Sequence, residues 1–76
     1  MMTPLQCKLG RTALGWTVRQ LAHKAKVSAN TVSRFETGKV EAQPSTVIVM
    51  QQALEAAGVE FTNGEAPGVR LKRKGS

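Results

Sequence analysis

Four stretches of the chain place apolar residues three or four positions apart, and each stretch ends at a glycine or a polar break. This spacing gathers the apolar side chains on one face of a helix, so it predicts four short amphipathic helices. We expect these helices at about residues 4–14, 18–25, 29–37 and 45–57.

The first and fourth predicted helices have clear start and stop signals. Thr3 can cap the first helix, with Pro4 in the first helical position, and Gly58 ends the fourth. The helical spacing then assigns the residues that should face the core. They are Leu5, Leu9, Ala13 and Leu14 in the first helix, and Val47, Met50, Leu54 and Ala57, with Ile48 alongside, in the fourth.

The second and third predicted helices are joined by a tight corner. Thr17 can cap the second helix in a capping box with Gln20, while Ser28 caps the third helix and Gly38 ends it. Small and polar side chains with an arginine on an exposed helix suit a surface that reads a DNA groove. The inward residues are Leu21, Ala22, Ala25, Val32 and Phe35, and the outward residues of the third helix are Ala29, Asn30, Ser33 and Arg34.

After residue 58 the pattern changes from helical spacing to strict alternation. Residues 59–61 and 69–72 alternate apolar and polar side chains, which is typical of strands, and the intervening TNGEAPG is rich in turn formers. We therefore expect a C-terminal β-hairpin at 59–72, followed by a basic disordered tail at 73–76. Residues 1–58 form the preceding helical domain.

The length and the cysteine content restrict the class of protein. A chain of 76 residues forms one small, marginally stable domain, which a dimer could support. The single cysteine, Cys7, cannot form an intrachain disulfide and suits a reducing compartment. The sequence has neither the apolar run of about 20 residues that a membrane helix needs nor a signal peptide. These features predict a cytoplasmic protein.

Charge is segregated along the chain. Residues 1–40 hold seven basic residues and one acidic residue, residues 41–66 hold four acidic residues and no basic one, and the remainder holds four basic residues. A basic front half that contains the helix pair favours a polyanionic partner. His23 stands alone, and no acid–base constellation or phosphate-binding glycine loop is present, so we expect no enzymatic activity, no metal and no cofactor.

The ordered motifs of residues 7–61 resemble the phage-repressor, or Xre-type, helix-turn-helix regulators of bacteria and phages. This resemblance implies a mainly α fold, in which a compact four-helix domain precedes the hairpin. The motifs are Arg11-x-x-Leu14-Gly15-Trp16-Thr17, Leu21-Ala22, Val27-Ser28-x-x-Thr31-Val32 and Phe35-Glu36-x-Gly38.

The resemblance also implies roles for individual residues. Residues 29–37 would be the recognition helix in the major groove. Arg11 and Glu36 would form a structural ion pair, and Val18 stands where family members often carry a polar residue, which removes one expected DNA contact. Base readout would come from Ala29, Asn30, Ser33 and Arg34, and phosphate contacts from Thr17, Arg19, Ser28 and Lys39.

The sequence thus predicts a regulator that binds double-stranded DNA, as a dimeric repressor that reads an inverted repeat. The alternative is a protein-binding helix-turn-helix module, an antitoxin or antiactivator that sequesters a toxin or another transcription regulator. Its support is Val18 and the acidic segment of residues 41–66. For the homodimer, we expect the exposed edge of the hairpin to pair across a two-fold axis. The dimerisation residues would be Val59, Phe61, Val69 and Leu71.

Overall fold

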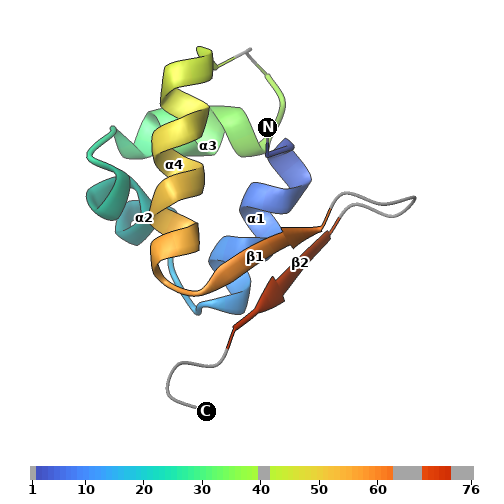
Figure 1. The fold of residues 1–76 in the computed structure, drawn as a ribbon. Coiled ribbons are helices and arrows are strands. Elements are labelled where there is room, and N and C mark those ends of the chain that lie inside the picture. The colour runs from blue at the N-terminus through green and yellow to red at the C-terminus, as the bar shows by residue number, and fades with distance from the viewer. Residues whose placement is uncertain (1, 40–41, 63–67, 73–76) are drawn as a thin grey trace.

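The computed structural model describes residues 2–39, 42–62 and 68–72 of the chain. In this part of the chain, four helices lead into a two-stranded antiparallel hairpin (Figure 1), so the predicted mainly α fold with a C-terminal hairpin is confirmed. The elements are α1 (Pro4–Ala13), α2 (Val18–Ala25), α3 (Ala29–Glu36), α4 (Pro44–Ala56), β1 (Val59–Thr62) and β2 (Gly68–Leu71).

Side-chain caps set the starts of the first three helices. Thr3 and Gln6 form a reciprocal capping box at α1, and Thr17 and Gln20 form a second one at α2. At α3 the Ser28 hydroxyl accepts a hydrogen bond from the third backbone N–H of the helix. Each cap satisfies a donor that a helix N-terminus otherwise leaves unpaired. The helix starts predicted from these residues are confirmed.

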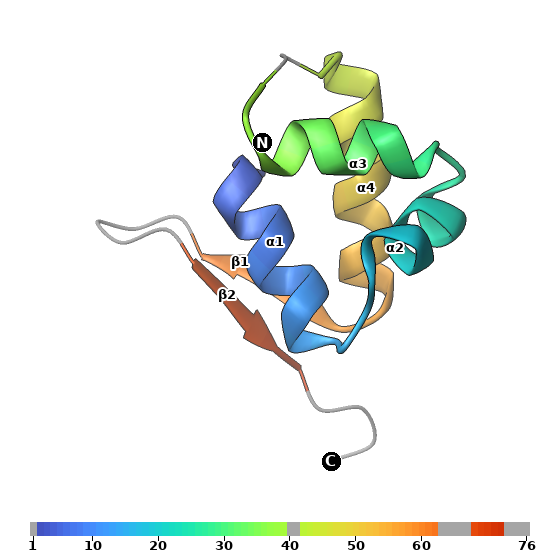
Figure 2. The same ribbon diagram turned by 180° about the vertical axis from the view of Figure 1, so that it is seen from behind.

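The core lies where α4 crosses α2 and α3, which are seen in front of α4 in Figure 2. The residues predicted to face inward from α2, α3 and α4 are buried, except that Ala57 is half-buried and Ile48 keeps 43% of its surface exposed. Trp16 packs half-buried against this cluster. The buried side chains are Leu21, Ala22, Ala25, Val32, Phe35, Val47, Met50 and Leu54.

The inward face predicted for α1 is wrong. Leu5 and Leu9 are 60% and 38% exposed, and Ala13 is also exposed, whereas Gln6, Cys7 and Gly10 are buried. Gly10 lies so close to β1 that an added Cβ would sit 3.2 Å from Cγ1 of Val59. The helix is therefore turned toward its small and polar residues, because only they allow this close approach. Leu14, at the end of the helix, is half-buried against the core.

A buried glutamine joins α1 to the hairpin. The Gln6 amide nitrogen donates hydrogen bonds to the carbonyl oxygens of Thr62 at 3.0 Å and Gly68 at 3.2 Å, one on each strand. Its amide oxygen accepts from the Thr3 N–H at 3.0 Å. Because these bonds satisfy the amide, Gln6 can be 99% buried without an unpaired polar atom.

The hairpin turns its apolar face toward the helices. Val59 pairs with Leu71 and Phe61 with Val69, so these four side chains share one face of the sheet. Gly58, with a φ of +107°, turns the chain from α4 into β1. The predicted strands are confirmed, while most of the connecting loop and the tail at 73–76 lie outside the described residues.

Candidate nucleic-acid interface

A three-residue corner separates α2 from α3. Lys26 adopts a left-handed backbone conformation with a φ of 59°, and its neighbour Val27 packs half-buried against the core. The Val27 N–H donates to the Ala22 carbonyl at 3.0 Å, which closes the end of α2. A left-handed residue with a Cβ costs about 1–2 kcal/mol. The packing of the two helices is therefore strong enough to impose this conformation on a lysine.

The third helix presents one buried and one exposed face. Val32 is fully buried, while Asn30, Ser33 and Arg34 are exposed. Ala29 is different, because it is half-buried and packs against the core cluster. Three of the four residues predicted to read bases thus reach solvent freely, and the fourth presents only part of its methyl group.

The four residues predicted to contact phosphate, Thr17, Arg19, Ser28 and Lys39, are all exposed. The hydroxyl oxygens of Thr17 and Ser28 accept backbone hydrogen bonds as caps, at 3.1 Å each, and the Thr17 hydroxyl proton is left for donation. Ser28 shares a 2.7 Å hydrogen bond with the Thr31 hydroxyl. Neither helix has an acidic residue in its first turn. Both N-termini therefore keep the positive end of the helix dipole that favours anions.

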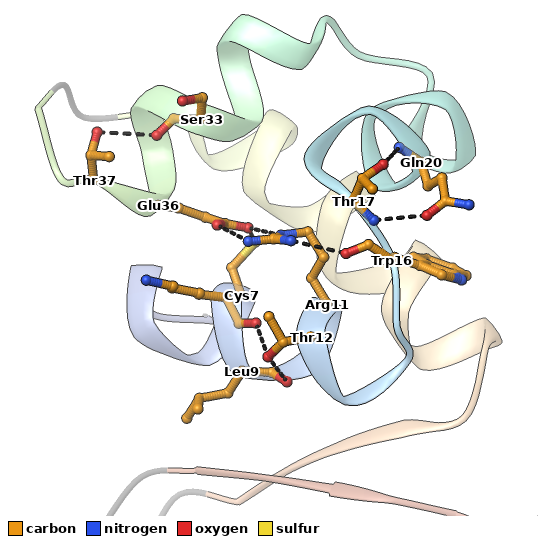
Figure 3. A network of polar contacts seen from close by, with 11 residues as sticks. Cys7, Leu9, Arg11, Thr12, Trp16, Thr17, Gln20, Ser33, Glu36 and Thr37 are labelled. Carbon is orange, nitrogen blue, oxygen red and sulfur yellow. Dashed lines mark hydrogen bonds and ion pairs between the residues drawn. The ribbon is translucent and has the colours of Figure 1, made fainter.

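A buried ion pair lies between α1 and the C-terminal end of α3 (Figure 3). Arg11 binds Glu36 in a bidentate manner, with Nε–Oε2 and Nη2–Oε1 distances of 2.8 and 2.9 Å, and also donates to the Trp16 carbonyl at 2.9 Å. The Arg11 and Glu36 side chains are only 12% and 6% exposed. The structure thus brings together the two residues that the sequence predicted to pair.

The same cluster includes Cys7, whose thiol donates to Glu36 Oε2 at 3.5 Å. Burial, reinforced by the negative charge of Glu36, raises the pKa of Cys7 to about 12. The cysteine is therefore a neutral thiol with a structural hydrogen bond. It is neither an exposed nor an activated nucleophile.

A helix-turn-helix domain model matches residues 8–62, which run from α1 through β1. The chain belongs to the helix-turn-helix domain family. No curated protein matches the sequence. The matched range includes α2, α3 and the corner between them. The domain indicates a DNA-binding regulator, and members of the family are not typically enzymes.

The ion pair gives the helix-turn-helix surface a single sign of charge. Glu36 is the only acidic residue between positions 2 and 39, and Arg11 neutralises it. The sequence predicted the Arg11–Glu36 pair, but it did not identify Lys8, Lys24 and Lys26 as candidate DNA contacts. The other basic residues of this segment, all exposed, are Lys8, Arg19, Lys24, Lys26, Arg34 and Lys39.

Val18, the departure from the family pattern, has a structural explanation. Its side chain is half-buried and packs against the core cluster at the start of α2. An apolar residue here contributes to the packing of the helix-turn-helix domain. Its presence therefore gives no specific support to a protein partner over DNA.

The four residues predicted to make the dimer differ in how they are placed. Val59 is only 3% exposed and belongs to the core of its own chain, so its side chain contributes to the fold of the monomer, and its part in a dimer stays a prediction. Phe61 and Val69 are half-buried against the same core, and Leu71 is 45% exposed.

Two specific features are absent from the described residues. Within residues 2–39, 42–62 and 68–72, no three His, Cys, Asp or Glu side chains come together as a metal site requires. In the same ranges, no helix has both the length and the apolar content needed to cross a bilayer.

Proposed function

We propose that this helix-turn-helix protein binds double-stranded DNA in a sequence-specific manner, and that it acts as a homodimeric repressor of transcription. The observation that carries the proposal is the surface of α3. This helix buries Val32 and Phe35 and exposes Asn30, Ser33 and Arg34, within a segment whose one acidic residue is neutralised internally. The segment therefore combines hydrogen-bonding side chains with an uninterrupted positive field, which is what a DNA groove attracts.

The exposed residues of α3 have distinct tasks in the proposed complex. Arg34 can donate two hydrogen bonds to the O6 and N7 of a guanine, and Asn30 can pair with the N6 and N7 of an adenine. Ser33 can donate or accept, and the partly exposed methyl group of Ala29 can contact a thymine methyl. Sequence preference would therefore depend mainly on Asn30 and Arg34, because bidentate pairs discriminate most strongly.

The capping residues and the surrounding lysines would hold the backbone. The hydroxyl groups of Thr17 and Ser28 and the charges of Arg19 and Lys39 are exposed and can approach phosphate oxygens. Such contacts fix the register of a protein on DNA and make binding strongly dependent on salt.

Repression by occlusion is the simplest consequence. One recognition helix reads only a few base pairs, and a two-fold dimer gains specificity from two half-sites about 34 Å apart. The longest principal extent of the monomer, 36 Å, is about the length of one such repeat. A dimer bound in this way would cover the promoter DNA that polymerase needs.

The test is a selection from a random duplex library, followed by binding measurements on two variants that each remove one charge. We expect the library to yield an inverted repeat. Arg34→Ala should cost about 1–3 kcal/mol and relax the preference at one base position of each half-site. The matched control, Lys39→Ala, should weaken binding to all sequences alike and reduce the salt slope by about 1.

Absence of any enriched motif at low salt would refute the proposal. The protein would then belong to the alternative class, in which a helix-turn-helix module sequesters a toxin or another transcription regulator. In that case Arg34→Ala would leave the activity nearly unchanged.

A further inference from the structure

The exposed leucines of α1 lie beside the outer strand of the hairpin. On a helical wheel, Leu9 and Leu5 lie about 60° and 100° from Gln6, on the side away from Cys7. Cys7 faces α3 and Gln6 faces the hairpin. Leu5 and Leu9, called here the leucine flank, therefore lie beyond Gln6, on the side of α1 that is next to the hairpin and farther from α3. Figure 3 shows Leu9 pointing away from the Arg11–Glu36 pair. Because α1 packs chiefly on β2, this flank borders that strand.

The two sides of the hairpin therefore differ in character. Next to β1, a shallow cleft against α4 has a mainly polar rim that includes Gln51, Glu55 and Glu60. Next to β2, on the face of the sheet that α1 covers, three leucines are exposed: Leu5 at 60%, Leu9 at 38% and Leu71 at 45%. Only the β2 side combines an apolar flank with the edge of a strand.

The backbone register shows which groups of β2 face outward. The Lys72 N–H donates to the Gly58 carbonyl at 2.7 Å, so residues 58 and 72 form a hydrogen-bonded pair. Hydrogen-bonded and non-hydrogen-bonded pairs alternate along an antiparallel ladder. Glu60 and Arg70 therefore point their backbone groups at each other, whereas Val69 and Leu71 point theirs away from β1.

We propose that a second copy of this chain pairs with β2 along this outer edge, in antiparallel orientation, about a two-fold axis through Arg70. The axis places Val69 of one copy opposite the partner's Leu71, and Leu71 opposite the partner's Val69. Both residues whose backbone groups face outward are therefore paired on each strand. A continuous four-stranded sheet results. This inference rests on the proposed dimeric function and names the surface that forms the dimer.

The α1 helices of the two copies would lie on the same face of this sheet. In each copy α1 packs chiefly on β2, so the two helices would face each other across the two-fold axis. The two α1 helices would then lie side by side on one face of the sheet, with Leu5 and Leu9 of each copy against the same residues of the other. This contact would explain why the leucines of α1 are exposed in the monomer.

Charge on the opposite face is partly balanced within each copy, where one carboxylate, Glu60, contacts two cations, Arg70 and Lys72. The axis brings two copies of Arg70 next to each other, but Arg70 is bound to Glu60 on the same face, and Lys72 lies 3.4 Å from the same carboxylate. Hydrogen bonds from Arg70 and Lys72 lower the pKa of Glu60, which keeps the neutralising charge in place at neutral pH.

The first test is disulfide formation in the full chain. In the proposed dimer the two copies of residue 70 form a non-hydrogen-bonded pair, with Cα atoms about 4.5 Å apart, within the range that a disulfide bridges. Arg70→Cys should therefore convert to a covalent dimer when treated with oxidised glutathione. The matched control, Glu60→Cys, loses the same ion pair, but its two Cα atoms would be about 14 Å apart, three strand spacings, so it should form no covalent dimer. Equal rates of cross-linking in the two variants, or none in either, would overturn the inference.

The second test is sedimentation of the protein without DNA. The wild type should sediment at twice the 8.2 kDa mass of the monomer. Leu9→Lys should sediment as a monomer, while Ile48→Lys, which places the same charge at a residue of similar exposure on α4, should remain a dimer. A monomeric wild type, or equal loss of the dimer in both variants, would refute the β2 interface. A wild type that is monomeric is also the result expected if the β2 edge binds only a strand of another protein. Because DNA is absent, this outcome is distinct from a failure to select a DNA motif.

Discussion

Removal of Arg11 is the perturbation for which the structure gives the clearest magnitude. Arg11→Met keeps most of the length of the side chain but deletes two hydrogen bonds to Glu36 and one to the Trp16 carbonyl. The Glu36 carboxylate, 6% exposed, would keep only the weak Cys7 thiol donor. Loss of one partner of a buried ion pair costs about 3–5 kcal/mol, because the other charge stays desolvated.

This cost is large for a chain of 76 residues, whose total free energy of unfolding is about 4–11 kcal/mol at 0.05–0.15 kcal/mol per residue. With a shift of about 4–8 °C per kcal/mol, the melting temperature should fall by at least about 12 °C. The single tryptophan, Trp16, makes the measurement direct, because its carbonyl is one of the Arg11 partners and its fluorescence follows unfolding.

The control is Arg19→Met, which removes an exposed arginine of α2 and should change stability by less than about 0.5 kcal/mol. The double variant Arg11→Met/Glu36→Leu should be more stable than the sum of the two single effects predicts, because no buried charge is left unpaired. If Arg11→Met and Arg19→Met unfold at the same temperature, the reasoning about this pair is wrong.

Two further predictions concern the other buried polar residues. Because the pKa of Cys7 is raised from 9.0 to about 12, the stabilising contribution of its neutral thiol is complete below pH 9 and is lost as pH rises toward 12. In urea titrations at alkaline pH, the free energy of unfolding should fall by about 1.4 kcal/mol per pH unit. A free energy of unfolding that does not change with pH, and that Cys7→Ala does not alter, would contradict this. Gln6→Leu should leave the carbonyls of Thr62 and Gly68 without their buried donor and cost about 1–3 kcal/mol. Amide exchange should quicken in the hairpin before it quickens in α2, and uniform protection would refute the role of Gln6.

The sequence was most informative where the determinants of structure are local. The boundaries of α1, α2 and α3 follow from caps within three residues of each helix start, as Thr3, Thr17 and Ser28 illustrate. The inward residues of α2 and α3 also followed, because those helices are short and have one clear apolar stripe. The contacts that the exposed face of α3 makes with DNA remain a prediction.

The errors arose where tertiary contacts decide the environment of a residue. Leu5 and Leu9 have the spacing of a core stripe but are exposed, because Gln6 and Gly10 alone permit α1 to approach the hairpin closely. No local pattern indicates that a glutamine will find two carbonyl acceptors some sixty residues away. Alternation likewise identifies the two faces of the strand that contains Val59 without showing which face the helices cover.

The ten-residue α1 helix connects two surfaces that would otherwise be independent. Arg11 forms an ion pair with the end of α3, and Gln6 donates hydrogen bonds to both strands of the hairpin. In a dimer joined at β2, the distance between the two recognition helices would thus be set by rigid elements rather than by a linker. Such a protein would have a fixed spacing between its two recognition helices. It would accept an operator with one fixed separation between its half-sites and reject those with a base pair added or removed.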